Sequence, residues 1–405
     1  MVNTDTQEAS KVEIAPEKYL LENLPEVKRF QERLQKAQQA GIEQPYFRLR
    51  EEGDQRINLN SYNYLGLNGH PEVTAAAVQA IERYGTSVSA SRLVGGELPL
   101  HRQLEDEIAR FLGTESALAL VSGHATNVTL ISFLLSPADM VIHDACAHDS
   151  AIRGALASRA KRYQFPHNDM DALEKLLQEK RQNYRRALVL VEGLYSMDGD
   201  HPDLNRLLAL QEEYKFILMV DEAHSFGVLG ETGRGLAELQ SIPRNSNIIW
   251  MGTLSKSLAS CGGYLAGSKA FIDFLKHSLP GFVYSVGLTP PNSAAALAAL
   301  KILQREPERV ARLRSLSNFF QERLSEAGFD TGQSCKTAIF PVFIDDPHKV
   351  MMVNEHLHRA GVETSAIIYP AVPKKLSRLR FFLSSLHTEE QLARAVDTLS
   401  KILYG

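Results

Sequence analysis

Three apolar stretches decide the fold: ALVLVEGLYS at 187–196, FILMVDEAH at 216–224 and NIIWMGTLSK at 247–256. Each begins with a short, almost wholly apolar run and then turns polar, which is typical of a strand that is buried on both faces. A helical pattern lies between the strands, for example at 204–214. This alternation predicts an α/β fold with a large, mainly parallel sheet covered by helices.

The alternation of predicted strands and helices continues toward the N-terminus and changes toward the C-terminus. Further short strands are expected at 117–121, 140–143 and 161–165. After Pro290 and Pro291 the order becomes irregular, which predicts a smaller α+β domain. Its expected elements are helices at 292–304, 307–327, 349–360 and 388–403 and strands at 339–344, 367–369 and 378–384.

The first sixty residues form a segment of their own. Apolar residues recur at helical spacing over 17–40, and Pro25 divides that pattern. We expect a helix that packs on the body of the protein; a helix that binds a partner is the alternative. The predicted organisation is an N-terminal helical segment (1–60), a large domain (61–290) and a small C-terminal domain (291–405).

Composition excludes several classes of protein. The 405 residues include 44 basic and 48 acidic side chains, a net charge of −4, which disfavours a nucleic-acid binder. Three cysteines without a CxxC pair indicate neither a disulfide framework nor a zinc site. The N-terminus lacks an apolar signal sequence, and the apolar runs fall short of the ~18 residues of a membrane span. We expect a soluble, cytoplasmic protein.

Polar side chains gather at the carboxyl ends of the three central strands, where open α/β sheets bind their ligands. The expected crevice collects Glu192, Ser196, Asp221, His224, Thr253, Ser255 and Lys256. A nucleotide site is disfavoured, because VDEAH at 220–224 is not accompanied by any Gly-Lys dipeptide and the glycines of 227–235 do not space as GxGxxG. His143, Asp144, His148 and Asp149 could offer metal ligands, but no HExxH pattern occurs, and we expect no metal.

A lysine, a buried carboxylate and a phosphate cradle together suit pyridoxal 5′-phosphate (PLP). Lysine forms a Schiff base with PLP, and a carboxylate keeps its pyridine nitrogen protonated so that the ring accepts electrons. A phosphate needs N–H groups at a helix N-terminus and hydroxyl groups. The turn Ser122-Gly123-His124, together with Thr253 and Ser255, supplies both.

At these residues the chain resembles the α-oxoamine synthases, a family of fold-type I PLP enzymes. The matching segments run in the family's order from about residue 45: NSYNYLGL (60–67), SGHATN (122–127), AHDS (147–150), EGLYSMDGD (192–200), VDEAHSFGVLGETGRG (220–235), GTLSKSLASCGGY (252–264), YSVGLTPP (284–291) and RLRFFLSSLHT (378–388). The resemblance covers members such as 8-amino-7-oxononanoate synthase and serine palmitoyltransferase. GHATN is most similar to members associated with polyketide assembly.

The resemblance implies a role for each site residue. Lys256 would bind PLP and then act as the base, Asp221 would pair with the pyridine nitrogen, and His224 would bond the phenolic oxygen. His148 would stack on the ring, with Ser196 beside it. Ser122, Gly123, His124, Thr253 and Ser255 would hold the phosphate, and Ser285 would reach the neighbouring subunit's cofactor. Arg380 would bind the amino-acid carboxylate, near Asn63.

The implied reaction is a decarboxylative condensation of a small amino acid with an acyl thioester, giving an α-amino ketone, CO2 and a free thiol. An aminotransferase on the same fold is the alternative, and a degenerate scaffold without activity is a third. A homodimer with shared sites is implied, and the acyl donor would be acyl-CoA or an acyl carrier protein. Basic clusters could bind that donor: Arg153, Arg159, Lys161 and Arg162; Arg181, Arg185 and Arg186; Lys374, Lys375 and Arg378.

Overall fold

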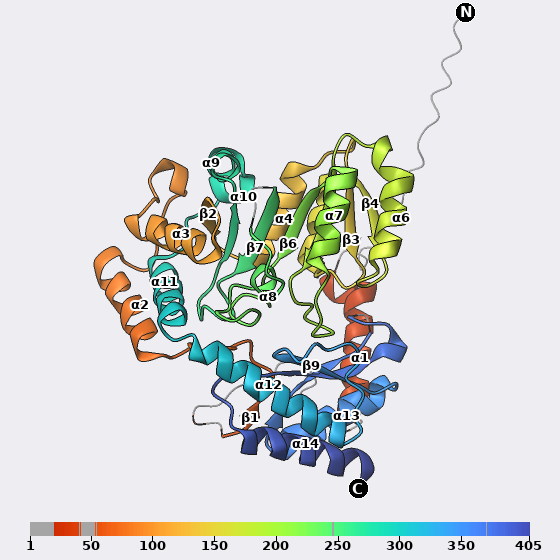
Figure 1. Ribbon diagram of the computed structural model, residues 1–405. Coiled ribbons are helices and arrows are strands. Elements are labelled where there is room, and N and C mark those ends of the chain that lie inside the picture. Colours follow the sequence, from red (N-terminus) through yellow and green to blue (C-terminus); the bar gives the residue numbers. More distant parts are fainter. Residues whose placement is uncertain (1–19, 40, 42–52, 54, 245–246, 370) are drawn as a thin grey trace, which may run out of the picture. The chain divides into compact units, whose positions relative to one another are not determined.

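The computed structural model describes residues 20–39, 41, 53, 55–244, 247–369 and 371–405 (Figure 1). The chain divides into two units, 1–55 and 56–405. Within the first unit, a short 3-10 turn (Leu21–Asn23) precedes helix α1 (Pro25–Gln39). Pro25 opens that helix, a position where its missing N–H costs nothing. The ends of the predicted helix, at 17–19 and 40, lie outside the described residues.

A seven-stranded sheet forms the centre of the second unit, in the order β2-β8-β7-β6-β5-β3-β4. The strands are β2 (Ser116–Leu120), β3 (Met140–Asp144), β4 (Lys161–Phe165), β5 (Ala187–Glu192), β6 (Ile217–Asp221), β7 (Ile248–Thr253) and β8 (Gly263–Gly267). The five strands from β7 to β4 are parallel, whereas β8 pairs antiparallel with both β2 and β7. The prediction of a large, mainly parallel sheet is therefore confirmed.

Both faces of this sheet are covered, as alternation along β5 shows. Leu188 and Leu190 belong to one apolar cluster, with residues of α4 and α5, whereas Val189 and Val191 belong to the other. Successive strand residues point to opposite faces, so an unbroken apolar run means burial on both sides. The covering helices include α3 (Pro99–Leu112), α4 (Gly123–Leu134), α5 (Asp149–Ser158), α6 (Met170–Lys180), α7 (Leu204–Tyr214), α8 (Leu236–Leu239), α9 (Lys269–Ser278) and α10 (Pro280–Val283).

The C-terminal part holds a smaller antiparallel sheet in the order β11-β12-β9. Its strands are β9 (Ile339–Phe343), β11 (Ser365–Ile367) and β12 (Arg378–Phe382), accompanied by α12 (Glu308–Glu326), α13 (Pro347–Arg359) and α14 (Glu389–Tyr404). Helices α2 (Pro71–Tyr84) and α11 (Pro290–Arg305) pack against each other on the left of the view in Figure 1. The predicted domain limits at residues 60 and 290 stay a prediction.

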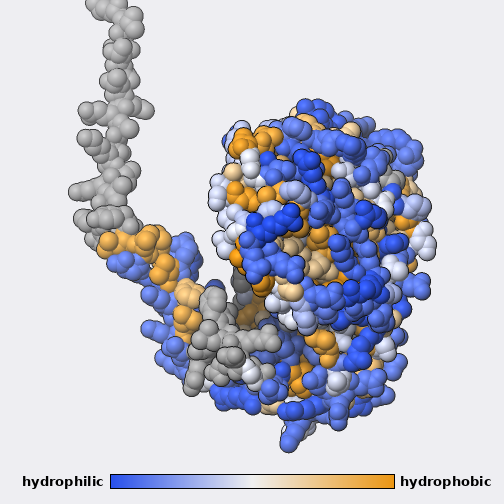
Figure 2. All heavy atoms as spheres, turned by 90° about the vertical axis from the view of Figure 1, so that its left-hand side faces the viewer, coloured by the Kyte–Doolittle hydropathy of each residue, from blue (hydrophilic) through white to orange (hydrophobic). Residues whose placement is uncertain are grey.

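One short pairing joins distant parts of the chain. β1 (Ile57–Asn58) lies parallel to β10 (Val362–Glu363), so the entry of the chain into the second unit is held beside its C-terminal part. The surface seen in Figure 2 is mostly hydrophilic, with separate apolar patches between the polar side chains. No helix within the described ranges is both long and apolar enough to cross a bilayer.

Candidate active site

The carboxyl ends of β5, β6 and β7 meet at one cavity of about 160 Å³. Glu192 lies opposite Asp221 in the sheet register, and Asp221 lies opposite Met251. The cavity is lined by Gly123, His124, Asn127, His148, Ser150, Glu192, Asp221, Ala223, His224, Met251, Thr253 and Lys256. The structure therefore brings together seven of the residues with a predicted role, from four segments of the chain, and Glu192 from a fifth.

Lys256 follows β7 and is the lysine of this cavity. Its ammonium group lies 5.6 Å from the centre of the Tyr62 ring. Burial lowers the pKa of Lys256 to about 8, although the carboxylates of Asp221 and Glu192 act in the opposite direction. A lysine with such a pKa is partly neutral near pH 7, so it can act as a nucleophile or a base.

Asp221 ends β6 and is 5% exposed. Its Oδ2 accepts a hydrogen bond from Nδ2 of Asn127 at 2.8 Å, and its Oδ1 accepts from the N–H of Ala223 at 2.9 Å. Both carboxylate oxygens are thus held in place. Such a fixed carboxylate facing the cavity fits the predicted partner of a protonated ring nitrogen.

His148 caps the N-terminus of α5. The Nδ1 of its ring lies 2.7 Å from Oγ of Ser150, and its backbone N–H donates to Oε1 of Glu192 at 2.7 Å. Burial lowers the pKa of the His148 imidazole. Glu192 is fully enclosed, and burial, followed by the neighbouring charge of Asp221, raises its pKa to about 8. Glu192 is therefore mainly a neutral carboxylic acid at pH 7.

His224 is held on the other side of the cavity. The hydroxyl of Tyr64 lies 2.7 Å from its Nδ1, and the ring stacks on Phe382 at a centroid distance of 6.1 Å. Burial lowers the pKa of His224 well below its ordinary value, assisted by Lys256 and Arg380. The imidazole is consequently neutral.

The predicted phosphate cradle lies where α4 begins. Ser122 caps this helix by accepting from the N–H of Ala125. The other N–H groups at the start of α4 have no partner inside the helix, as at the start of any α-helix. A Cβ added at Gly123 would come within 3.0 Å of Oγ1 of Thr253, so only glycine leaves that space open. The hydroxyl of Thr253 donates to the carbonyl of Gly262 at 2.9 Å and lies 3.1 Å from Oγ of Ser255. Free N–H groups, a bare backbone and hydroxyls fit a phosphate.

Arg380 is buried on β12 and is incompletely paired. Its Nη1 donates to the carbonyl of Ser196 at 3.0 Å, while its Nε is buried with no hydrogen-bond partner among the described residues. A buried guanidinium that lacks a carboxylate partner fits a site for a substrate carboxylate. Ser196 serves here through its backbone and lies outside the cavity lining.

Two predicted residues stand apart from the cavity. The Oδ1 of Asn63 accepts from the N–H of Asn68 at 3.1 Å, which stabilises a turn. Ser285 is half-buried between the exposed Tyr284 and Val286, and its hydroxyl donates to the carbonyl of Val286. Within a single chain, Ser285 is therefore not part of the site.

Three residues that complete the site were not predicted from the sequence: Asn127, Ser150 and Tyr64. Asn127 follows Gly123 by four residues on α4, so both lie on one helix face. That spacing was the available signal for Asn127. The contacts of Tyr64 with His224 and of Ser150 with Asn127 are tertiary, and no local pattern reveals them.

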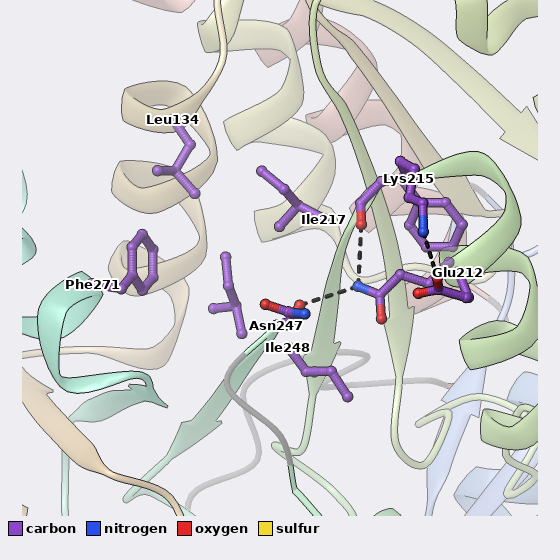
Figure 3. Close-up of a pocket in the computed structure, with 10 residues that line it drawn as sticks. Leu134, Glu212, Lys215, Ile217, Asn247, Ile248 and Phe271 are labelled. Atoms are coloured by element: carbon purple, nitrogen blue, oxygen red, sulfur yellow. Dashed lines mark hydrogen bonds and ion pairs between the residues drawn. The ribbon is translucent and has the colours of Figure 1, made fainter.

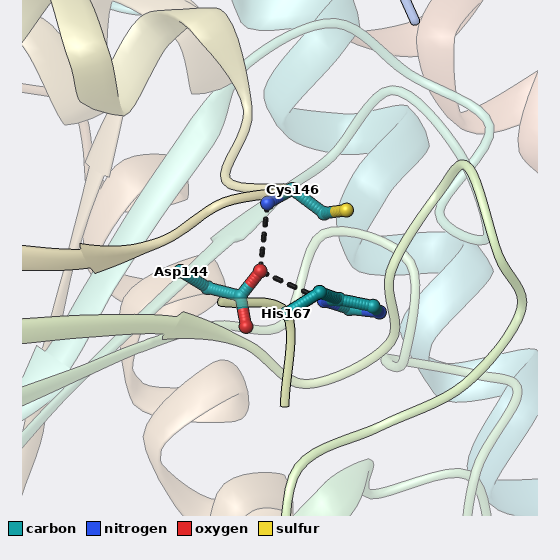
Figure 4. Close-up of side chains that lie close together, drawn as sticks. All are labelled: Asp144, Cys146 and His167. Carbon is teal, nitrogen blue, oxygen red and sulfur yellow. Dashed lines mark hydrogen bonds and ion pairs between the residues drawn. The ribbon is translucent and has the colours of Figure 1, made fainter. Parts of the chain in front are cut away.

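A neighbouring cluster of Asp144, Cys146 and His167 has ligand-type atoms within 4.8 Å of one another (Figure 4). His167 bonds Asp144 through Nδ1 at 2.8 Å and Asp200 through Nε2 at 3.0 Å. These carboxylates raise the pKa of His167 far above its ordinary value. An imidazolium between two carboxylates accounts for the cluster as an ion-pair network that braces the loop after β5.

A second cavity, of about 500 Å³, lies at the opposite ends of the strands, where β6 and β7 begin (Figure 3). It is lined by Ile217 and Ile248, which begin β6 and β7, and by apolar side chains such as Leu134 and Phe271. Its charged members, Lys215 and Glu212, pair with each other. The groups suited to chemistry are therefore in the smaller cavity.

Comparison with known proteins identifies the family. Residues 54–399 match the family described as aminotransferase class I and II. The chain belongs to this family. It is 44% identical over 356 residues to 8-amino-7-oxononanoate synthase of Geobacter metallireducens, covering 87% of this chain and 90% of the relative.

Solved structures agree with this assignment. Serine palmitoyltransferase from S. paucimobilis, solved with a PLP–myriocin adduct, superposes with a TM-score of 0.89 at 27% identity, over 94% of this chain and 98% of that one. An 8-amino-7-oxononanoate synthase from Francisella tularensis has a TM-score of 0.76 at 26% identity, over 86% and 98% of the two chains. The predicted fold-type I architecture and the resemblance to the α-oxoamine synthases are confirmed. Members of this family are PLP-dependent enzymes.

Proposed function

We propose that this α-oxoamine synthase condenses alanine with an acyl thioester, releasing CO2 and a free thiol. The reaction class and the PLP cofactor follow from membership of the family; the amino acid is our proposal. The relatives are named for their product, 8-amino-7-oxononanoate, which has a ketone at C7 next to an amine at C8 and a terminal methyl at C9. Loss of the carboxylate from alanine leaves a carbon that bears an amine and a methyl group, which matches C8 and C9.

The observation that carries the proposal is the convergence of Lys256, Asp221, His148 and His224 on one cavity, beside an incompletely paired Arg380. PLP, when bound, supplies an electron sink that acidifies the α-proton of the amino acid. Asp221, fixed by Asn127, would hold the proton on the pyridine nitrogen, and neutral His224 would donate to the phenolic oxygen. The α4 N-terminus, Gly123 and Thr253 would hold the phosphate.

The remaining groups act on the substrate. Arg380 would bind the amino-acid carboxylate through its unused N–H groups. Lys256, whose pKa burial lowers to about 8, would remove the α-proton at its neutral amine. His148 would face the carboxylate or the acyl oxygen.

A substrate panel tests this function. Purified enzyme loaded with PLP is mixed with alanine, glycine or serine and with acyl-CoAs of several lengths, and both thiol and CO2 release are measured. We expect stoichiometric release of both, fastest with alanine. Exchange of the amino group with a keto acid, without thiol release, would instead identify the alternative aminotransferase.

We further propose that the working unit is a homodimer in which Ser285 completes the partner's site. Ser285 lies outside its own cavity, and the neighbouring Tyr284 is 87% exposed. Other large apolar side chains exposed on adjoining loops are Val286, Leu93 and Val94. Contact with a second copy would cover these side chains.

Mixed dimers of Lys256→Ala and Ser285→Glu subunits test the shared site. If Ser285 acts across the interface, the subunit that retains Lys256 receives an intact serine from its partner. We expect one site per mixed dimer with wild-type PLP affinity. If Ser285 acts in its own subunit, no wild-type site forms, because the carboxylate repels the phosphate.

The acyl donor is proposed to be acyl-CoA or an acyl carrier protein, in the cytoplasm. The basic clusters differ in how far they remain available for it. Arg153 pairs with Asp149, Arg185 pairs with Asp139, and Arg378 is buried against Asp198. Exchange of Lys374 and Lys375 for glutamate should raise the KM for the thioester if that cluster binds it, and an unchanged KM would remove the cluster from consideration.

A further inference from the structure

A continuous chain of hydrogen bonds links Asp221 to His148 through two residues. Nδ2 of Asn127 lies 2.8 Å from Oδ2 of Asp221 and 2.9 Å from Oγ of Ser150. Oγ of Ser150 in turn lies 2.7 Å from Nδ1 of His148. Asn127 and Ser150 are each 1% exposed and come from α4 and α5, which pack against each other. The two middle members of this chain are thus held in fixed positions by the packing of the two helices.

The direction of each bond follows from the chemistry of the groups. If the Asn127 amide were reversed, its oxygen would face the carboxylate of Asp221, and two acceptors would meet. The amide nitrogen must therefore face Asp221, and its two protons go to Asp221 and to Ser150. Oγ of Ser150 accepts from Asn127, so its own proton is free to be donated to Nδ1 of His148.

A second donor reaches the same nitrogen. The backbone N–H of Ser150 lies 3.2 Å from Nδ1 of His148. A backbone N–H can only donate, so Nδ1 must accept and carries no proton. Among the described residues Nε2 of His148 has no hydrogen-bond partner, and the ring lines the cavity.

We propose that Asn127 and Ser150 are positioning residues that lock His148 in the tautomer with its proton on Nε2. In this state the imidazole offers a hydrogen-bond donor to the cavity and has no free lone pair there. Burial, Lys256 and His124 favour the neutral ring, and they outweigh Asp221 and Asp149, which favour the imidazolium. Toward the substrate, Lys256 then acts as a base and His148 as a fixed donor.

This assignment gives His148 a definite part in the proposed function, on which this step rests. Its Nε2–H would donate to a substrate oxygen that bears negative charge, either the carboxylate or the acyl oxygen as the thiol leaves. A ring with its proton on Nδ1 would present a lone pair to the same oxygen and repel it. The relay therefore selects the tautomer that stabilises charge on the substrate.

Nitrogen-15 NMR of selectively labelled histidine tests the tautomer directly in the full-length enzyme, without substrates and both with and without PLP. The His148 signals are assigned by their loss in His148→Gln. We expect a pyridine-like Nδ1 and a pyrrole-like Nε2 at neutral pH. In Ser150→Ala the shorter hydroxyl bond is lost and only the backbone N–H at 3.2 Å still donates to Nδ1, so the form with its proton on Nδ1 should become detectable. The kcat should fall about tenfold, with a smaller change in the KM for alanine.

Matched variants separate positioning from stability. Ser158 is also buried on α5, and its hydroxyl bonds only backbone groups, those of Ala155 and Ala160, so Ser158→Ala should leave the tautomer and kcat unchanged. Ser150→Thr keeps a hydroxyl group and should retain the wild-type tautomer and kcat. A wild-type His148 with its proton on Nδ1 would overturn the proposal, as would a Ser150→Ala enzyme that matches Ser158→Ala in tautomer and kcat. Since the NMR needs no substrate, a failure to condense alanine would refute the proposed function alone.

Discussion

The hydroxyl of Tyr64 lies 2.7 Å from Nδ1 of His224, in a fully buried contact that joins the start of the second unit to the end of β6. Burial raises the pKa of Tyr64 well above its ordinary value, so the phenol keeps its proton. No other acceptor of that proton occurs among the described residues. Tyr64 therefore donates to Nδ1, and His224 carries its own proton on Nε2.

Tyr64→Phe should weaken PLP binding while preserving the fold. One lost hydrogen bond is worth about 1 kcal/mol, so the Kd for PLP should rise about fivefold. Fluorescence titration of the apoenzyme with PLP measures it. Tyr264→Phe is the matched control, because the buried Tyr264 hydroxyl has no partner in the described part of the chain. An equal loss of PLP affinity in both variants would contradict the role of the Tyr64–His224 bond.

The lowered pKa of Lys256 predicts how fast the apoenzyme takes up PLP at each pH. Only the neutral amine attacks the aldehyde of PLP, and burial lowers the pKa of Lys256 to about 8 from 10.5. The rate constant for covalent attachment should rise with pH and level off above about pH 8. Stopped-flow absorbance measures this profile. An increase that continues to about pH 10.5 would show that Lys256 has an ordinary pKa, and Lys256→Ala should show no attachment.

Glu192 makes the stability of the apoenzyme depend on pH. Its pKa is raised from 4.5 to about 8, so from about pH 4.5 to pH 8 the unfolded chain has released this proton while the folded chain retains it. The free energy of unfolding should therefore decline as the pH rises from about 4.5 to about 8. Glu192→Gln lacks the proton and should remove this part of the decline, as urea unfolding at several pH values would show.

The same position offers a second comparison. Glu192 accepts a hydrogen bond from the backbone N–H of His148 at 2.7 Å. Glutamine at this position keeps an oxygen that can accept the same bond, whereas alanine leaves the backbone N–H without a partner. Glu192→Ala should cost about 1–3 kcal/mol of unfolding free energy, and Glu192→Gln much less. If both variants lose the same stability near pH 7, the hydrogen bond to His148 is not the reason for the carboxyl group.

The three central strands β5, β6 and β7 were predicted correctly because each contains an almost unbroken apolar run, as at 216–220, that is buried on both faces. β8 (Gly263–Gly267) was not predicted, because its sequence GYLAG begins and ends with glycine and lacks the β-branched residues of its neighbour β7. β1 and β10 have two residues each, too few for any periodicity. Their pairing depends on tertiary contacts.

The site divides in the same way. Asp221 and Lys256 could be placed from the residues, because each follows a strand whose end is clear from the sequence. Asn127 and Ser150 could not, since their function lies in hydrogen bonds to residues that are distant in sequence or on another helix. The incompletely paired state of Arg380 is likewise visible only once β12 is folded against the loop after β5.

Two arginines on β12 separate substrate binding from stability. Arg380 and Arg378 occupy alternate positions, so both side chains lie on the same side of the strand. Arg378 has a carboxylate partner, Asp198, and its Nε and Nη1 also donate to the carbonyls of Leu376 and Met197. Nε of Arg380, in contrast, has no partner among the described residues.

Arg380→Lys should therefore raise the KM for alanine, and Arg378→Lys should lower the melting temperature. Lysine cannot form the two parallel bonds that a guanidinium makes to a carboxylate, and charged hydrogen bonds are worth about 1.5–3 kcal/mol, so we expect a KM increase of about 10- to 100-fold with less effect on kcat. For Arg378→Lys the KM should change less than about threefold. Steady-state kinetics and calorimetry on both variants decide the matter: an Arg378→Lys enzyme with the larger rise in KM would transfer the carboxylate site from Arg380 to Arg378.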